Sequence, residues 1–340
     1  MGGNGTRRKY LKLMISLAVT AGLFFLFARS FPLSSVAAAF HDLRWGWVGA
    51  ALCAYAASTF IRVRRFRVMG ISILPLTALV QISYLHYFLS NLLPLRSGEL
   101  AFVYLLNKDR GAPLSVNIAS LLVVRMFDFL AIVVWFFIAL VVLFPDRIAA
   151  FDPMTLGALL VLAILIFLLL MLLWMRAAVG KMVYIALKPF ERRHPDWKET
   201  WTRFWNDFGL SVDRLKNRHA LYSIAWQSLA GWLCIYFITA CFMAALGTPL
   251  GFWESTFITS FPPIASLIPL GTVGNFGTVE TGWTVGLLGV GIPLEQAVPL
   301  SVALHILTIL LQAVTALQAW VWRKMRRTKT VQGSVEAPAS

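Results

Sequence analysis

Charged and polar residues interrupt the apolar stretch 81–99, QISYLHYFLSNLLPLRSGE. Pro94 breaks a helix, and Arg96, Gly98 and Glu99 follow it within five positions. Hydrocarbon offers no hydrogen-bond partner to a broken backbone or a charge, so a stretch of this kind must lie against protein or a water-filled cavity. An arginine beside a broken helix end is suited to bind a phosphate through two parallel hydrogen bonds. The stretch therefore predicts a site for an anionic group.

A second stretch, 266–280, has the same character. Its sequence SLIPLGTVGNFGTVE runs from apolar residues through Pro269 to Gly274, Gly277 and Glu280. Backbone N–H groups freed at glycines can help to hold an anion. The glutamates of both stretches are expected to position cations or to carry a coupling proton. Glycine also lets membrane helices pack closely, so the glycines alone are weak evidence.

Other candidates lie near these stretches or inside a long apolar run at 117–144. Asn91 and Asn275 supply neutral hydrogen bonds to a ligand. Arg125 and Asp128 stand three residues apart, so a helix places them on one face, where their pairing lowers the cost of carrying both into the membrane. Two interpretations remain open for this pair: part of an anion site, or a structural ion pair between helices.

Composition indicates whether the chain folds in water or in a lipid bilayer. The chain has 59% hydrophobic and 13% charged residues, and its mean hydropathy is +0.75, which is typical of an integral membrane protein. A net charge of +15 fits loops beside anionic lipid better than nucleic-acid binding, so no nucleic acid is expected as a partner. The three cysteines form no pair or cluster that predicts a disulfide or a metal site.

Six spans are predicted, at about 13–28, 45–61, 117–144, 154–175, 221–246 and 297–322. The basic run RVRRFR after the second span is interpreted as a cytoplasmic stop signal. With both interrupted stretches entering and leaving on one side, nearly all lysines and arginines fall on one face. The positive-inside rule then places both termini in the cytoplasm of a multi-pass protein of the cell (inner) membrane.

This topology predicts an inverted repeat, with halves at about 8–144 and 154–325 in a single membrane domain, 1–327. The first interrupted stretch would enter from the cytoplasm and the second from outside, so that both meet near the midplane, which is a pattern typical of transporters. The alternative is that both are loops on the membrane surface. Residues 328–340 are expected to be a disordered tail. In the polar region 178–218, an amphipathic helix is predicted, which either lies in the membrane interface or caps the cytoplasmic ends of the spans.

Three motifs resemble the transmembrane region of lysylphosphatidylglycerol synthases, a family also called flippase-like. They are N-L-L-P-L-R-S-G-E at 91–99, R-x-x-D at 125–128 and G-x-x-G-x-x-E at 274–280, and the resemblance covers about residues 8–325. It implies a protein that moves lipids or lipid-linked headgroups between leaflets. Family members often carry a proline where this chain has Val273 and an arginine where it has His305. The soluble aminoacyl-transfer domain of some members is not expected here, so a stand-alone member is predicted.

The fold expected is therefore an all-α polytopic membrane protein with six transmembrane helices and two re-entrant broken-helix stretches. The function expected is translocation of a lipid or lipid-linked anionic substrate between leaflets. The alternative is a non-catalytic membrane subunit that presents lipid to a synthase or glycosyltransferase. No enzymatic activity, metal or cofactor is predicted, because no catalytic constellation, metal-ligand set or P-loop is found. The candidate substrate-binding residues are Asn91, Arg96, Gly98, Glu99, Arg125, Asp128, Gly274, Asn275, Gly277, Glu280 and His305.

Overall fold

The computed structural model describes most of the chain and all of its described regular structure is helical. The described residues are 40–69, 74–93, 98–108, 114–146, 197–266 and 273–335, with scattered positions between 152 and 188. The predicted first span lies outside the described residues, and the fourth is described only at scattered positions.

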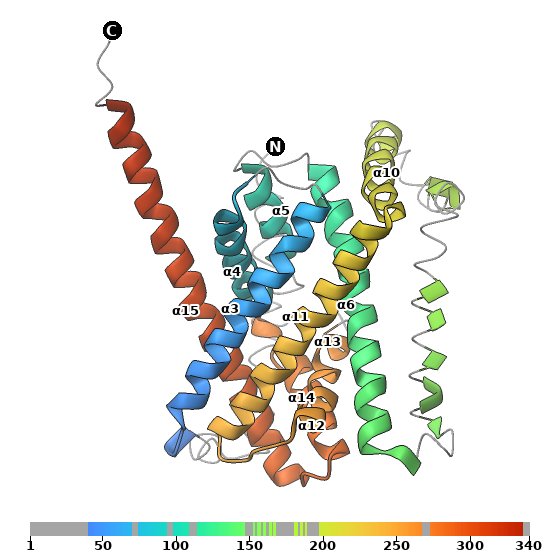
Figure 1. Cartoon of the computed structure of the whole chain (residues 1–340), viewed down its shortest axis with the longest axis vertical. Coiled ribbons are helices and arrows are strands. Elements are labelled where there is room, and N and C mark those ends of the chain that lie inside the picture. The colour runs from blue at the N-terminus through green and yellow to red at the C-terminus, as the bar shows by residue number, and fades with distance from the viewer. Residues whose placement is uncertain are drawn as a thin grey trace, which may run out of the picture.

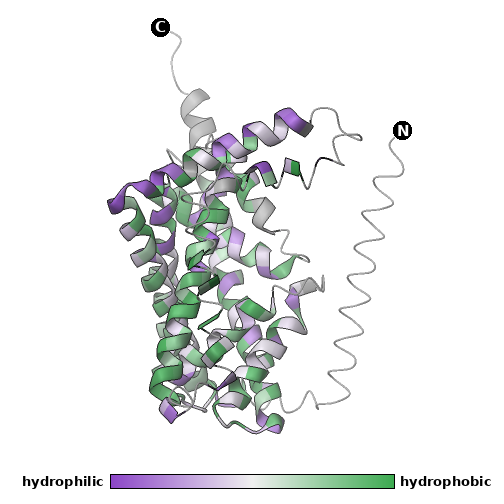
Figure 2. Ribbon diagram, turned by 90° about the vertical axis from the view of Figure 1, so that its right-hand side faces the viewer, coloured by the Kyte–Doolittle hydropathy of each residue, from purple (hydrophilic) through white to green (hydrophobic). Residues whose placement is uncertain are grey.

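Four helices of the described part are long and apolar enough to cross a membrane. They are α3 (Trp45–Val68), α6 (Leu114–Leu143), α11 (Arg218–Ala245) and α15 (Leu294–Val335), and they form the bundle in Figure 1. Hydrophobic residues occupy much of the length of the helices, and hydrophilic residues gather toward the end that carries α10 (Trp197–Asp213) (Figure 2). The predicted second, third, fifth and sixth spans correspond to these four helices.

Two of these helices are longer than the sequence predicted. Helix α3 does not end at Ile61 but continues through the basic run to Val68. Helix α15 continues to Val335 and projects from the bundle (Figure 1). The disordered tail expected at 328–340 stays a prediction.

Each interrupted stretch belongs to a helical hairpin. The first hairpin consists of α4 (Leu76–Leu92) and α5 (Gly98–Lys108). The second consists of α12 (Phe252–Thr259) and α13 (Phe261–Ala265), which lead inward, and of the short η4 (Val273–Asn275) and α14 (Thr278–Gly289), which lead back. The two hairpins occupy opposite ends of the bundle, and α4 contacts η4 where they meet (Figure 1).

Glycines allow the arms of each hairpin to pack closely. A Cβ at Gly98 would collide with the backbone of Leu89 and Ser90 on the opposite arm. In the second hairpin, a Cβ at Gly282 would lie 2.6 Å from Cα of Pro262. Because the obstacle is backbone in both cases, it cannot turn aside as a flexible side chain would. Glycine is thus required here for packing.

We expect Gly282→Ala to destabilise the protein by about 1–3 kcal/mol, the usual effect of overpacking a closed contact. The matched control is Gly49→Ala in the second turn of α3, where nothing lies within 4 Å of the new Cβ. That change should be neutral or stabilise by up to about 1 kcal/mol through helix propensity. Thermal unfolding of the two variants in detergent, followed by size-exclusion chromatography, measures the difference. Equal melting temperatures would contradict the close packing.

The amphipathic helix predicted in the polar region is present as α10, followed by the 3-10 turn η3 (Arg214–Lys216). Its apolar face is covered by protein, because Phe208 and Val212 are buried in one cluster with Val124 of α6 and Leu106 of α5. Aromatic rings stack along the same face, including Trp205 on Phe208. This arrangement favours the capping interpretation over a helix with its apolar face in lipid.

Candidate functional site

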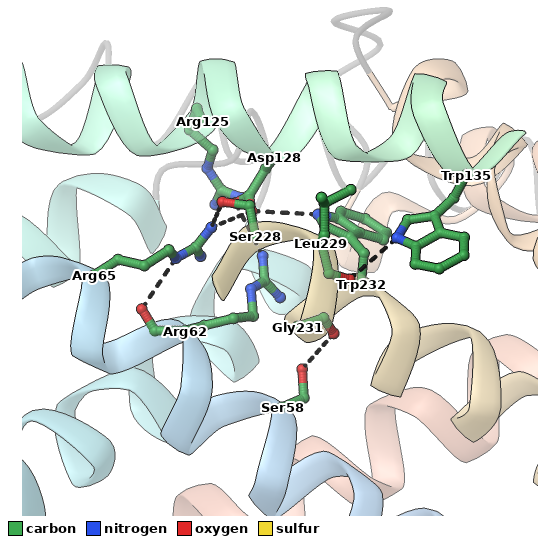
Figure 3. Close-up of polar contacts among 10 residues, drawn as sticks. All are labelled: Ser58, Arg62, Arg65, Arg125, Asp128, Trp135, Ser228, Leu229, Gly231 and Trp232. Atoms are coloured by element: carbon green, nitrogen blue, oxygen red, sulfur yellow. Dashed lines mark hydrogen bonds and ion pairs between the residues drawn. The ribbon is translucent and has the colours of Figure 1, made fainter. Parts of the chain in front are cut away.

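A buried carboxylate, Asp128 of α6, is surrounded by three arginines (Figure 3). Arg65 Nη1 lies 2.5 Å from Asp128 Oδ1, and Arg62 Nη2 lies 3.1 Å from Oδ2. Arg125 Nη1 is further away, at 3.8 Å. Trp232 Nε1 also donates to Oδ1 at 3.3 Å. The pair predicted from sequence is therefore the weakest of three ion pairs on this carboxylate.

The two closer arginines come from α3, from the run interpreted as a stop signal. Both are buried, with 8% of Arg62 and 1% of Arg65 exposed, whereas Arg64 and Arg67 are exposed. Residues 62 and 65 are buried because they share one helical face, the face that packs on α11. Arg65 is held further by Ser228 of α11 at 2.7 Å.

A cavity of about 240 Å³ opens beside this cluster in the interior of the bundle. Residues from α3, α4, α6, α11, α12, α13, α14 and α15 line it, so both hairpins and all four long helices contribute. The polar lining residues are Arg62, Tyr87, Ser90, Asn91, Arg125, Asp128, Trp232, Thr259, Ser266, Trp283, His305, Thr308 and Gln312.

Positive charge exceeds negative charge at this wall of the cavity. Among the described side chains, the three guanidinium groups face one carboxylate, which leaves two positive charges in excess within the cluster. The guanidinium of Arg62 also lies over the rings of Tyr87 and Trp232, at 5.2 and 5.5 Å from their centroids. Aromatic faces stabilise a cation that water does not reach. Such a wall is suited to receive an anion.

The inner ends of the two hairpins contact each other. The amide nitrogen of Asn275 lies 3.4 Å from the carbonyl oxygen of Ser90 and 3.5 Å from that of Asn91. Both Asn275 and Gly274 have positive φ, 53° and 71°, which turns the chain sharply at this point. Asn91 in turn donates to Gln312 of α15 at 2.7 Å. The two stretches, far apart in sequence, thus converge on the cavity.

A second buried charge lies at the start of α14. Glu280 Oε2 accepts the backbone N–H of Gly277 at 2.7 Å, and Oε1 lies 2.7 Å from His305 Nδ1 of α15. Both side chains are almost fully buried. Glu280 therefore fixes the tip of the second hairpin to the histidine that lines the cavity.

The structure brings most of the candidate residues to one place. Asn91, Arg125, Asp128 and His305 line the cavity. The second tip is formed by Gly274, Asn275, Gly277 and Glu280.

The remaining candidates lie apart from the cavity lining or outside the described part. Gly98 serves the packing of the first hairpin. Arg96 lies outside the described residues, and so does the side chain of Glu99, although its backbone belongs to α5.

Sequence reasoning missed several lining residues, among them Arg62, Tyr87 and Gln312. A signal for the first was present, because Tyr55, Ser58 and Arg62 recur at helical spacing on one face of α3. No comparable signal marks Gln312, which becomes significant only when α15 packs against α4.

Comparison with protein families finds a match to the model described as "Lysylphosphatidylglycerol synthase TM region", over residues 13–316. Comparisons with curated proteins and with solved structures gave no match. The matched region contains both hairpins, the arginine cluster around Asp128 and the pair of Glu280 and His305. The chain therefore belongs to the lysylphosphatidylglycerol synthase transmembrane-region family.

Proposed function

We propose that this protein translocates a lipid or lipid-linked substrate with an anionic headgroup between the leaflets of the membrane. The observation that carries the proposal is the interior cavity with excess positive charge at the meeting point of two hairpins from opposite ends of the bundle. A charge inside a membrane protein is costly, so its presence beside a cavity marks a substrate or ion pathway.

The headgroup phosphate is bound by Arg125, with Arg62 as the second cation. Arg125 is the more exposed of the two, with 26% of its side chain exposed against 9% for Arg62. Asn91 and Gln312 provide neutral hydrogen bonds on the opposite side of the cavity. In a site with little water, these contacts are stronger than in solution.

The topology proposed is six transmembrane helices and two re-entrant hairpins in an inverted repeat, in the inner membrane, with both termini in the cytoplasm. The four described spans and the opposed hairpins are consistent with it. The orientation is supported by basic residues at the end of the bundle that carries α10, among them Arg64, Arg67, Arg203, Arg214, Lys216 and Arg218.

The test is a transfer assay with purified protein in phosphatidylcholine vesicles. The vesicles carry a trace of fluorescent phosphatidylglycerol, a monoanionic probe, or of fluorescent phosphatidylcholine, a zwitterionic one. A membrane-impermeant quencher reports how fast each probe changes leaflet. We expect rapid transfer of the anionic probe and at least about tenfold slower transfer of the zwitterionic one, since a tenfold ratio needs only about 1.4 kcal/mol of charge-dependent binding. Protein that binds the anionic probe without moving it would instead indicate the non-catalytic subunit that presents lipid to an enzyme.

A further inference from the structure

The imidazole of His305 has one nitrogen engaged and one without a partner. Nδ1 lies 2.7 Å from Glu280 Oε1, whose second oxygen accepts from Gly277. Nε2, at the other edge of the ring, is buried and has no hydrogen-bond partner among the residues that the structure describes. Phe276 packs on the ring at 4.9 Å between centroids. An unpaired polar atom in a buried ring that lines a cavity calls for a functional explanation.

The protonation state of the imidazole determines whether Nε2 accepts or donates a hydrogen bond. A carboxylate that accepts from Gly277 and from the histidine places the proton of a neutral imidazole on Nδ1, which leaves a lone pair on Nε2. That lone pair repels an anion. When Nε2 takes up a proton, it becomes a donor, and Glu280 compensates the new charge. His305 can therefore contact an anion only in its protonated form.

Other ionisable groups near His305 come from every neighbouring element. Glu280 of α14 is in direct contact, Tyr87 of α4 lines the same cavity, and Arg62, Arg125 and Asp128 line its wall on α3 and α6. Three arginines, counting Arg65 behind this wall, oppose Asp128 and Glu280. Among the described side chains, one positive charge is thus in excess while His305 is neutral. An entering monoanion cancels this excess and favours protonation of the imidazole.

We infer that the Glu280–His305 pair is a proton-binding site and that the protein carries one proton together with each monoanionic headgroup. The inference rests on the proposed function. The proton comes from water on the side to which the cavity is open, binds to the lone pair of Nε2, and returns from the same atom to water on the other side as the headgroup leaves. No covalent bond of the lipid changes, and the pair that moves has no net charge.

Two properties of transfer test this inference in the same vesicles with fluorescent phosphatidylglycerol. Transfer should slow as the pH rises, by up to about tenfold for each pH unit, because one proton is needed per headgroup. An imposed pH gradient, acid on the side of departure, should accelerate transfer. An imposed membrane potential should not, because the moving pair is neutral. Transfer that ignores pH, or that responds to the potential instead, overturns the inference while leaving the proposed function in place. No transfer at any pH refutes the proposed function itself.

Three variants test whether the Glu280–His305 pair binds the transported proton. His305→Gln presents an amide that does not titrate, so transfer should be slower than in the wild type at acid pH and should no longer depend on pH. Glu280→Gln keeps an oxygen for the N–H of Gly277 but no longer stabilises an imidazolium, so its pH profile should move to lower pH. The matched control is His219→Gln at the exposed start of α11, which should keep the wild-type profile. A wild-type profile in either of the first two variants, each confirmed as folded by size-exclusion chromatography, would refute the assignment. If His305→Gln does not fold, Glu280→Gln decides alone.

Discussion

Replacing Asp128 by leucine should cost more stability than any other single change in the arginine cluster. The carboxylate is 3% exposed and compensates Arg62 and Arg65, which are themselves buried. Its removal leaves like charges facing each other without a counter-ion, and breaking a buried pair in this way costs about 3–5 kcal/mol. We expect most of the Asp128→Leu protein to be lost from the folded peak in size-exclusion chromatography after detergent extraction.

Two further variants test whether the stability lost in Asp128→Leu comes from the missing negative charge. Arg65→Leu combined with Asp128→Leu removes one charge of each sign, and Arg65 does not line the cavity, so part of the lost stability should return. Asp42→Leu is the control, because that carboxylate is 97% exposed and should tolerate the change. Wild-type stability of Asp128→Leu would show that the cluster contributes nothing to the fold.

Arg125→Gln should reduce transfer of the anionic probe by about 100-fold, the equivalent of about 3 kcal/mol of charge-assisted hydrogen bonding. The protein should remain folded, because Arg62 and Arg65 still compensate Asp128. Arg125→Lys should recover only part of the rate, since an ammonium lacks the two parallel donors of a guanidinium. Arg64→Gln on the exposed face of α3 is the control and should transfer at the wild-type rate.

The outcome of this experiment also decides between the two interpretations of the Arg125 and Asp128 pair. A folded but inactive Arg125→Gln supports the anion site. Loss of folded protein would make the pair structural, and transfer at the wild-type rate would exclude Arg125 from the site. The transfer assay and the folded fraction must therefore be measured on the same preparation.

The sequence was sufficient to predict the helical class, the four described spans and the amphipathic helix α10, because each depends on hydropathy or on helical periodicity within one segment. It also identified Asn91, Arg125, Asp128 and His305, which the structure places around one cavity. These residues could be recognised since polar groups are costly in apolar runs.

The partners of these residues could not be predicted. How closely Asp128 pairs with Arg65 depends on how α3 and α6 pack, and the local spacing indicated only the longest of its three ion pairs, with Arg125. The basic run at 62–67 combines two buried and two exposed arginines, which only the helical phase distinguishes. The contact of Asn275 with the end of α4 likewise depends on two hairpins that are distant in sequence.

The position of Asp128 restricts how such a protein can change shape. Its carboxylate joins α3 and α6, which lie in the first half of the chain, to Trp232 of α11 in the second half. Ser58 of α3 adds a bond to the backbone of Gly231 in α11. Rocking one half as a rigid body against the other would separate these groups and expose a charged network to hydrocarbon. Alternating access by movement of the two hairpins, with α3, α6 and α11 as a fixed frame, requires no such break.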